Sequence, residues 1–293
     1  MQLYRADFRA MASPCEVQLW SEQPKLAQHA LAAAQHEVAR IEAKYSRYRA
    51  DSVISRINAA AGSAPLPVDD ETAGLLDLGQ QCFADSDGRF DLTSGVLRRA
   101  WDFAQARLPE PGVVDALLPL VGWRKVHWQR PLFGLSKLGM QLDFGGIGKE
   151  YAADRAAAVL TELGMSHALV NLGGDVRVLG PQIDGRAWRI GIQHPRNSQA
   201  LLGYIDLSAG ALATSGDYQR FFELKGKRYC HLLNALTGWP VQGAQAATVW
   251  APLCVVAGAL ASVAMLQGEL GLNYLRAAGI QFLWVDAQGR VHQ

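Results

Sequence analysis

The segment 142–154 joins a short apolar run to a glycine turn, and the turn begins a helix. Gly145, Gly146 and Gly148 remove three side chains within four residues, and Lys149 follows directly. The free N–H groups at a helix start attract anions, and glycine lets a phosphate approach them closely. The pattern therefore favours a phosphate-binding turn. The alternative is a tight strand-to-helix turn with a solvated lysine, which this segment alone does not exclude.

This turn is not a Walker loop. Asp143 stands where that loop has its first glycine, and Glu150 stands where a serine or threonine would bind magnesium. Similar chemistry recurs downstream, because a glycine pair and an aspartate at 173–175 follow an apolar strand. The sequence Thr-Ser-Gly-Asp then occupies 214–217, and His231 follows a glycine hairpin. Several separate segments therefore offer groups that bind phosphate or move protons.

Taken together and in this order, these motifs resemble those of the FAD:protein FMN transferase family, the ApbE-like flavin transferases. The resemblance covers nearly the whole chain. It is carried by seven motifs in series, at 11–13, 45–58, 88–103, 143–149, 173–175, 214–218 and His231. It implies transfer of FMN from FAD to a threonine or serine hydroxyl of a partner protein, with release of AMP. Acceptors of the family carry a short motif that ends in Gly-Ala-Thr, which this chain lacks.

The resemblance also implies a flavin site. Asp143 and Lys149 are expected to line it, with the lysine near the phosphates. The other positions that match flavin contacts are Met11, Tyr48, Asp102, Phe103, Ala104 and Leu232. For Tyr48 and for the neighbouring Trp101, core packing is the alternative.

His231 matches the histidine that is thought to help the acceptor hydroxyl attack in this family. A neutral imidazole suits that proton transfer near pH 7. The motif departs from the family pattern, because Asn234 and Ala235 replace the usual aspartate and proline. Asparagine also favours turns, so the turn itself is expected to persist.

A magnesium site is the last implication of the resemblance. The carbonyl of Gly146 matches the family's main-chain ligand, and Ser262 matches a threonine ligand. The family's aspartate, four residues before that threonine, is replaced by Gly258. Magnesium is usually held by one or two carboxylates plus substrate phosphates. Without the aspartate, the pyrophosphate of FAD would supply most of the negative charge.

Two hypotheses about function follow. The first is a working, magnesium-dependent transferase. The second is a relative that binds FAD but is catalytically impaired because Gly258 carries no carboxylate; an FAD pyrophosphatase that yields FMN and AMP is a third option. If Gly258 is the defect, Gly258→Asp should restore activity. Rapid turnover without it would point to a substitute ligand, with Asp143 and Asp217 as the first candidates.

Composition excludes some other classes of protein. The net charge of +1 gives no electrostatic case for nucleic-acid binding. The four cysteines have no close spacing of the zinc-site kind, so we expect reduced, mostly buried thiols. Charges in the first twenty residues leave no room for the apolar region of a signal peptide. The apolar stretch 251–266 is shorter than the roughly 20 residues that span a bilayer, so we expect a buried helix and a cytoplasmic protein, although the family is often exported.

The elements that position these motifs alternate between helices and hairpins. Periodicity predicts helices over 25–44, 70–84, 93–104 and from 149 onward. It predicts strands over 15–20, 125–128, 140–144, 168–172, 176–179, 187–192, 203–207, 220–224, 228–233, 246–251 and 281–285. This order argues for an α+β fold with a largely antiparallel sheet flanked by helices, and the resemblance implies the ApbE-like two-lobed fold. We expect a single domain over 1–293, whose two lobes meet near 105–122.

Overall fold

The computed structural model describes all residues 1–293. Its centre is an eight-stranded sheet in the order β1-β2-β6-β7-β10-β13-β14-β15, in which every neighbouring pair is antiparallel. The strands are β1 (Gln2–Ala10), β2 (Ser13–Ser21), β6 (Ala168–Leu172), β7 (Asp175–Val178), β10 (Gly210–Gly216), β13 (Ala246–Ala251), β14 (Phe282–Val285) and β15 (Val291–His292). The predicted α+β class with a largely antiparallel sheet is confirmed.

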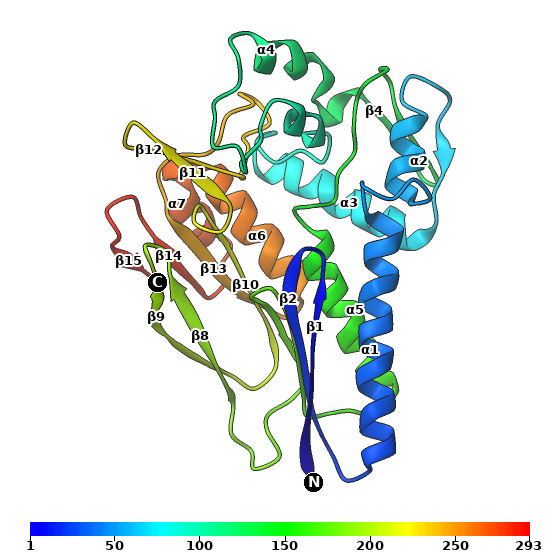
Figure 1. Ribbon diagram of the computed structural model, residues 1–293, viewed down its shortest axis with the longest axis vertical. Coiled ribbons are helices and arrows are strands. Elements are labelled where there is room, and N and C mark those ends of the chain that lie inside the picture. Colours follow the sequence, from blue (N-terminus) through cyan, green and yellow to red (C-terminus); the bar gives the residue numbers. More distant parts are fainter.

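Three helices cover one face of this sheet: α1 (Pro24–Tyr45), α5 (Gly148–Glu162) and α6 (Cys254–Leu266) (Figure 1). Alternate residues of the strands point toward them. Val17 and Leu19 of β2 and Val170 of β6, for example, belong to the large buried core. The other face of β6 and β7 packs against Trp188 of the hairpin formed by β8 (Trp188–His194) and β9 (Asn197–Leu207). The sheet is therefore covered on both faces near its centre.

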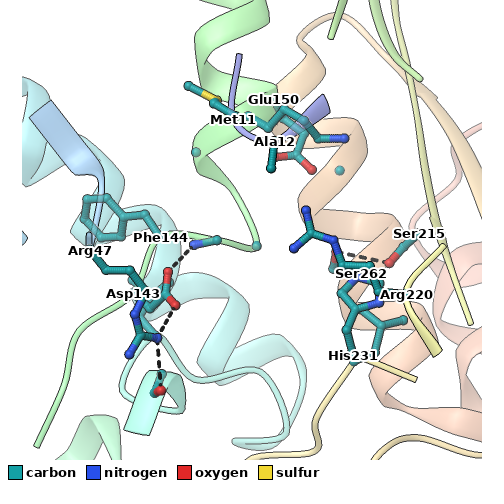
Figure 2. Close-up of a pocket in the computed structure, with 18 of the residues that line it drawn as sticks. Met11, Ala12, Arg47, Asp143, Phe144, Glu150, Ser215, Arg220, His231 and Ser262 are labelled. Carbon is teal, nitrogen blue, oxygen red and sulfur yellow. Dashed lines mark hydrogen bonds and ion pairs between the residues drawn. The ribbon is translucent and has the colours of Figure 1, made fainter. Parts of the chain in front are cut away.

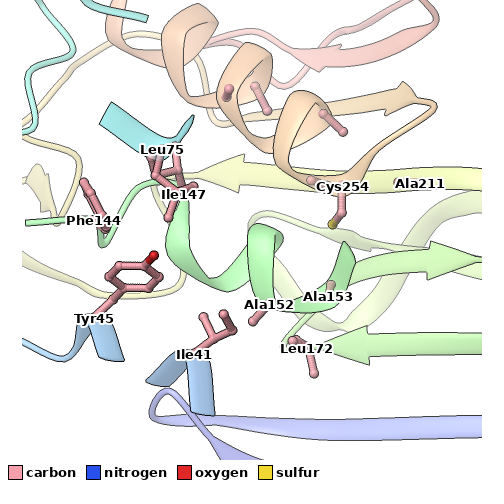
Figure 3. Close-up of a cluster of buried hydrophobic side chains, with 14 of the residues drawn as sticks. Ile41, Tyr45, Leu75, Phe144, Ile147, Ala152, Ala153, Leu172, Ala211 and Cys254 are labelled. Atoms are coloured by element: carbon pink, nitrogen blue, oxygen red, sulfur yellow. The ribbon is translucent and has the colours of Figure 1, made fainter. Parts of the chain in front are cut away.

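Small residues allow α5 to lie closely between α1 and α6. Ala152, Ala153, Ala156 and Ala157 are all buried. Figure 3 shows Ala152 and Ala153 between Ile41 of α1 and the start of α6. Alanine also has the best helix propensity, so the same residues favour the helix and its packing. Helix α6 is buried on nearly all sides, which explains why its sequence is apolar throughout.

The remaining elements gather mainly at one end of the large sheet (Figure 1). They include α2 (Val53–Ala59), α3 (Asp70–Asp85), α4 (Val113–Leu117), α7 (Gly271–Ala277) and a small sheet of β3 (Leu66–Pro67), β5 (Leu132–Leu135) and β4 (Val126–Gln129). A hairpin joins β11 (Phe221–Leu224) to β12 (Lys227–Cys230). The short 3-10 helices are η1 (Gly95–Arg99), η2 (Leu118–Leu120), η3 (Trp123–Lys125) and η4 (Gly268–Leu270). The segment 105–122 runs through α4 and η2.

Most predicted elements are found within a few residues of their expected bounds, among them the helices over 25–44, 70–84 and 251–266. All four cysteines are free and buried, as expected. None of the helices combines the length and apolar character that crossing a membrane requires. Strands β1, β3, β5, β10 and β15 and helices α2, α4 and α7 were not predicted.

Two predicted elements are wrong. The segment 93–104 forms only the short η1, because the Asp102 carboxylate accepts from the N–H groups of Ala104 and Gln105, which a longer helix would bond to its own carbonyls. Residues 140–144 are not a strand of any sheet. The Asn58 side chain takes the place of a neighbouring strand, since its amide oxygen accepts from the N–H of Leu142 and its amide nitrogen donates to the carbonyl of Leu142. A side chain has thus satisfied backbone groups that the pattern assigned to a ladder.

Candidate active site

A cavity of about 450 Å³ lies between the start of α5, the end of β10, the segment after β12 and helix α6 (Figure 2). Its volume is within the range of sites for small molecules and cofactors. The predicted site residues that line it are Met11, Tyr48, Phe103, Asp143, Gly146, Lys149, His231, Leu232 and Ser262. Asp102 and Ala104 do not line it. They form an exposed turn in which the Asp102 carboxylate accepts from the N–H of Ala104.

The tip of the β1–β2 hairpin reaches the cavity at Met11 and Ala12 (Figure 2). Both residues adopt left-handed backbone angles, with φ of 50° and 59°. Such angles are uncommon outside glycine and persist where the surroundings enforce them. Here the Glu42 carboxylate of α1 accepts a hydrogen bond of 2.8 Å from the N–H of Met11. The tip is therefore held by α1 before any ligand binds.

Asp143 is fixed by two arginines. Its carboxylate lies 2.8 Å from Nη1 of Arg47 and 3.4 Å from Nε of Arg98. The same carboxylate accepts from the N–H of Gly145 at 2.8 Å (Figure 2). Arg47 also donates to the carbonyl of Gly95 at 3.0 Å. Asp143 thus orients the glycine turn, and its charge is already balanced.

The glycines of this turn let neighbouring atoms approach the backbone closely, and they are not required by unusual backbone angles. Gly145, Gly146 and Gly148 all lie outside the positive-φ region. A side chain at 145 would come within 3.1 Å of Oδ1 of Asp143, and one at 146 within 3.0 Å of the Phe90 ring. Helix α5 begins directly afterward and has no side-chain cap. The N–H of Gly148 donates to the carbonyl of Phe144, whereas the N–H groups of Lys149 and Glu150 have no partner and no competing side-chain cap.

Lys149 is not a solvated lysine, so that alternative for the turn is wrong. Its Nζ lies 2.6 Å from the carboxylate of the buried Asp175, at the start of β7. Burial lowers the pKa of Lys149, but the carboxyls of Asp175 and Glu150 outweigh this effect and raise the pKa above its ordinary value. The lysine therefore brings a fixed positive charge to the glycine turn.

Glu150, which sequence reasoning did not select as a site residue, also lines the cavity. Its side chain is buried, and its Oε2 atom has no hydrogen-bond partner. Burial and then the charge of Asp175 raise the pKa of Glu150 to about 8. One signal was available in the sequence, because Glu150 falls three and seven residues before Ala153 and Ala157 and so lies on the buried stripe of the helix.

His231 follows the last residue of β12, and its N–H donates to the carbonyl of Arg220. Its Nδ1 atom is buried and has no hydrogen-bond partner. Burial, followed by the nearby charge of Arg220, lowers the pKa of His231 to about 4. The imidazole is therefore neutral at pH 7 and can accept a proton.

Ser262 projects from α6 toward the same space, 3.4 Å from the hydroxyl of Ser215 on β10 (Figure 2). The chain contains no cluster of three or more His, Cys, Asp or Glu side chains arranged to hold a metal ion. A metal at this place would therefore have to use carbonyl and hydroxyl oxygens and the phosphates of a ligand as well. Oxygen donors of this kind suit a hard cation such as Mg²⁺.

The aromatic residues near η1 divide into packing and lining groups. Trp101 is buried, donates from Nε1 to the carbonyl of Gly238 at 2.8 Å, and does not line the cavity. Phe103 stacks on it at 5.8 Å and does line the cavity. Tyr48 is 83% exposed at the rim. The packing alternative thus holds for Trp101 and is wrong for Tyr48.

Comparison with known proteins agrees with this geometry. Residues 11–284 match the sequence model of the ApbE family. The chain is 32% identical to the FAD:protein FMN transferase of Treponema pallidum, over 94% of this chain and 83% of that protein. It is 29% identical to the FAD:protein FMN transferase of Escherichia coli, over 83% of this chain and 73% of that protein.

Solved structures are similar over the same extent. The ApbE protein of Thermotoga maritima superposes with a TM-score of 0.91 at 29% identity, covering 100% of this chain and 97% of that one. The flavin transferase ApbE of Vibrio cholerae superposes with a TM-score of 0.87 at 26% identity, covering 97% of this chain and 94% of that one.

Proposed function

The chain belongs to the ApbE family, and from this premise we propose that it is an FAD:protein FMN transferase. The hydroxyl oxygen of a threonine or serine in a partner protein forms a bond to the FMN phosphorus of FAD. The bond from that phosphorus to the bridging oxygen of the pyrophosphate breaks, and the oxygen leaves with AMP. The observation that carries the proposal is that one cavity combines the glycine turn and Lys149 with a neutral histidine.

Recognition of FAD would rest on the start of α5. The uncapped N–H groups of the helix and the ammonium of Lys149 favour a pyrophosphate at this end of the cavity. We assign the flavin ring to Met11, Tyr48, Phe103 and Leu232, which line the rest of the cavity. Asp102 and Ala104 would contribute indirectly, because their turn fixes the position of Phe103.

We assign the transfer of the acceptor proton to His231. Its neutral imidazole has an unpartnered Nδ1 atom, so it has a free site for a proton in the absence of substrate. A positioned base of this kind typically contributes a factor of about 10² to 10⁴ to the rate. The backbone hydrogen bond from His231 to Arg220 holds the residue at the end of the β11–β12 hairpin.

We further propose that magnesium binds near the pyrophosphate. The carbonyl of Gly146 and the hydroxyl of Ser262 would hold it, and both residues line the cavity. When bound, the ion neutralises charge on the cleaved pyrophosphate.

We also propose that residues 1–293 form one domain with two lobes that meet near 105–122. The residues that line the cavity extend from position 11 to position 266, which supports a single domain.

The direct test is to incubate the protein with FAD, Mg²⁺ and a peptide whose Ser/Thr motif ends in Gly-Ala-Thr. We expect a peptide heavier by one FMN, less water, and an equal amount of AMP, both measured by mass spectrometry. Binding of FAD without AMP release would contradict the proposal and favour a flavin-binding protein. AMP release without modification of the peptide would instead identify an FAD pyrophosphatase.

A further inference from the structure

Helix α6 carries Gly258 where the family resemblance implies an aspartate, and the space of the missing side chain is filled from α5. A Cβ atom built on Gly258 would lie 2.5 Å from Cγ of Glu150 and 3.0 Å from its Cδ and Oε1 atoms. Cβ atoms do not approach other heavy atoms so closely. Gly258 and the Glu150 side chain therefore depend on each other, because any larger residue at 258 would displace the glutamate.

The register of the two helices places these residues opposite each other. The Asp154 carboxylate of α5 accepts hydrogen bonds of 2.9 Å from the N–H groups of Cys254 and Val255, the first residues of α6. Glu150 lies four residues before Asp154, and Gly258 lies four residues after Cys254. Both are one helical turn from the same anchor, so the contact follows from helix geometry.

The two residues already assigned to magnesium lie nearby in the sequence, Gly146 in the turn before α5 and Ser262 in α6. Gly146 precedes Glu150 by four residues, and Ser262 follows Gly258 by four. Glu150, Gly146 and Ser262 all line the cavity. The Glu150 carboxyl therefore enters the cavity between the anchor at the start of α6 and the proposed metal ligands.

One oxygen of the buried Glu150 carboxyl has no hydrogen-bond partner. Its Oε2 atom is buried and accepts no hydrogen bond, although nearly all buried polar atoms are paired in folded proteins. The adjacent cation, Lys149, already pairs with Asp175. Two buried carboxyls thus share one ammonium, and a bound cation would balance the second carboxyl in its charged form.

From this arrangement we propose that Glu150 supplies the acidic metal ligand that Gly258 lacks, so that the carboxylate of the magnesium site comes from α5 and not from α6. The proposal deepens the proposed function and rests on it for the identity of the ion. It also changes the expectation for catalysis. The replacement of aspartate by glycine at 258 then moves the metal-binding carboxylate to α5 and does not remove it.

The two substitute ligands considered from the sequence fit less well. Asp143 is held by Arg47 and Arg98 and also accepts from the N–H of Gly145. Asp217 does not line the cavity, and its two oxygens lie 2.6 and 2.7 Å from the guanidinium of Arg196. The expected rescue by Gly258→Asp also needs revision, since the new side chain would collide with Glu150.

The test measures metal binding directly, with Mn²⁺ as the probe. Mn²⁺ is titrated into protein saturated with FAD, and the free ion is counted by its electron paramagnetic resonance signal. We expect Glu150→Gln to weaken Mn²⁺ binding at least about tenfold, because it removes a charged ligand and keeps the shape of the side chain. Glu162→Gln is the control: it removes an exposed carboxylate at the far end of α5, outside the cavity, and should leave affinity within about twofold.

A second variant, in which the carboxylate is moved from α5 to α6, keeps the test informative if Glu150→Gln does not fold. We call it the transposed variant. Glu150→Gly with Gly258→Asp returns the carboxylate to α6 and removes the collision, so it should be more stable than Gly258→Asp alone and bind Mn²⁺ within about tenfold of the wild type. Wild-type affinity in folded Glu150→Gln would overturn the proposal. So would a transposed variant that folds but does not bind Mn²⁺.

Failure of this proposal is distinguishable from failure of the proposed function. AMP is measured in the same samples. If the wild type releases AMP and Glu150→Gln binds Mn²⁺ normally, the ligand assignment alone is wrong. If Mn²⁺ binding depends on Glu150 and neither FMN transfer nor AMP release occurs, the assignment holds and the transferase activity is wrong.

Discussion

Two sets of polar groups line the same cavity and differ in how they are partnered. The paired set is Arg47, Asp143 and Lys149, together with the buried Asp175, and its members form ion pairs of 2.8 and 2.6 Å. The unpaired set is His231 and Glu150, whose Nδ1 and Oε2 atoms are buried without a hydrogen-bond partner. Figure 2 shows Arg47 and Asp143 on one side of the cavity and His231, which follows β12, on the other.

This difference separates the groups that shape the binding site from the groups that take part in the reaction. Groups that are already paired fix the turn and the helix start before FAD arrives, which is how a binding site is preorganised. Groups without partners carry a desolvation cost in the free protein, and folded proteins keep such groups mostly where they act. Changes in the paired set should therefore affect stability and binding, and changes in the unpaired set should affect the reaction or the metal.

The largest effect is expected from His231→Ala. AMP release should fall about a thousandfold, since the acceptor hydroxyl loses its base, while the melting temperature and FAD affinity change little. Stopped assays of AMP by chromatography measure this, and His127→Ala, on exposed β4, is the control. An equal loss in the control, or unchanged turnover in His231→Ala, would remove His231 from the mechanism.

Lys149→Ala should have the next largest effect, and on the fold as well as on FAD. It leaves Asp175 buried and unpaired, which typically costs about 3 kcal/mol of unfolding free energy or more. Adding Asp175→Asn should recover part of that loss in urea titrations. Affinity for FAD should fall much more than affinity for riboflavin, which has no phosphate. Equal losses for both ligands in calorimetry would contradict the phosphate role.

Phe103→Ala should have a smaller effect, a loss of FAD affinity of about fivefold, as one aromatic contact is typically worth about 1 kcal/mol. The control is Phe222→Ala, which removes a buried ring that packs on Trp101 and Phe103 but does not line the cavity. That change should lower stability and spare FAD affinity in the folded protein. The same pattern in Phe103→Ala would mean that Phe103 only packs.

The smallest effect is expected for the protonation of His231 when the pH is lowered. Since the pKa of His231 is lowered to about 4, its imidazole should stay about 97% neutral at pH 5.5, where an ordinary histidine would be about 90% protonated. Nuclear magnetic resonance titration of the ring, assigned by comparison with His231→Ala, measures this. Protonation with a midpoint near 6.5 would show that the site is open to water. Because an unfolded chain takes up this proton first, stability should decline as the pH falls from about 6.5 toward 4.

Local signals in the sequence predicted the sheet class, and the family resemblance supplied the predicted site residues, of which all but Asp102 and Ala104 line the cavity. Alternation marks strand β2, an apolar run marks β6, and the glycine turn marks the start of α5. The false strand at 140–144 shows the limit, since Asn58 satisfies the backbone of Leu142 from 84 residues away. Glu150 was missed for the same reason. Its contact with Gly258 is decided by the register that Asp154 sets between two helices, and no local pattern encodes that register.

The edges of the central sheet bear on how this protein meets other chains. Strand β1 pairs only with β2, and its exposed positions include Arg5, Asp7 and Arg9. The other edge, β15, is two residues long. Charged or very short edge strands resist the addition of a further strand, which is how folded proteins avoid edge-to-edge aggregation. We therefore expect that an acceptor polypeptide does not bind by adding a strand to the central sheet. It would instead present its hydroxyl group from a loop or a free end at the mouth of the cavity.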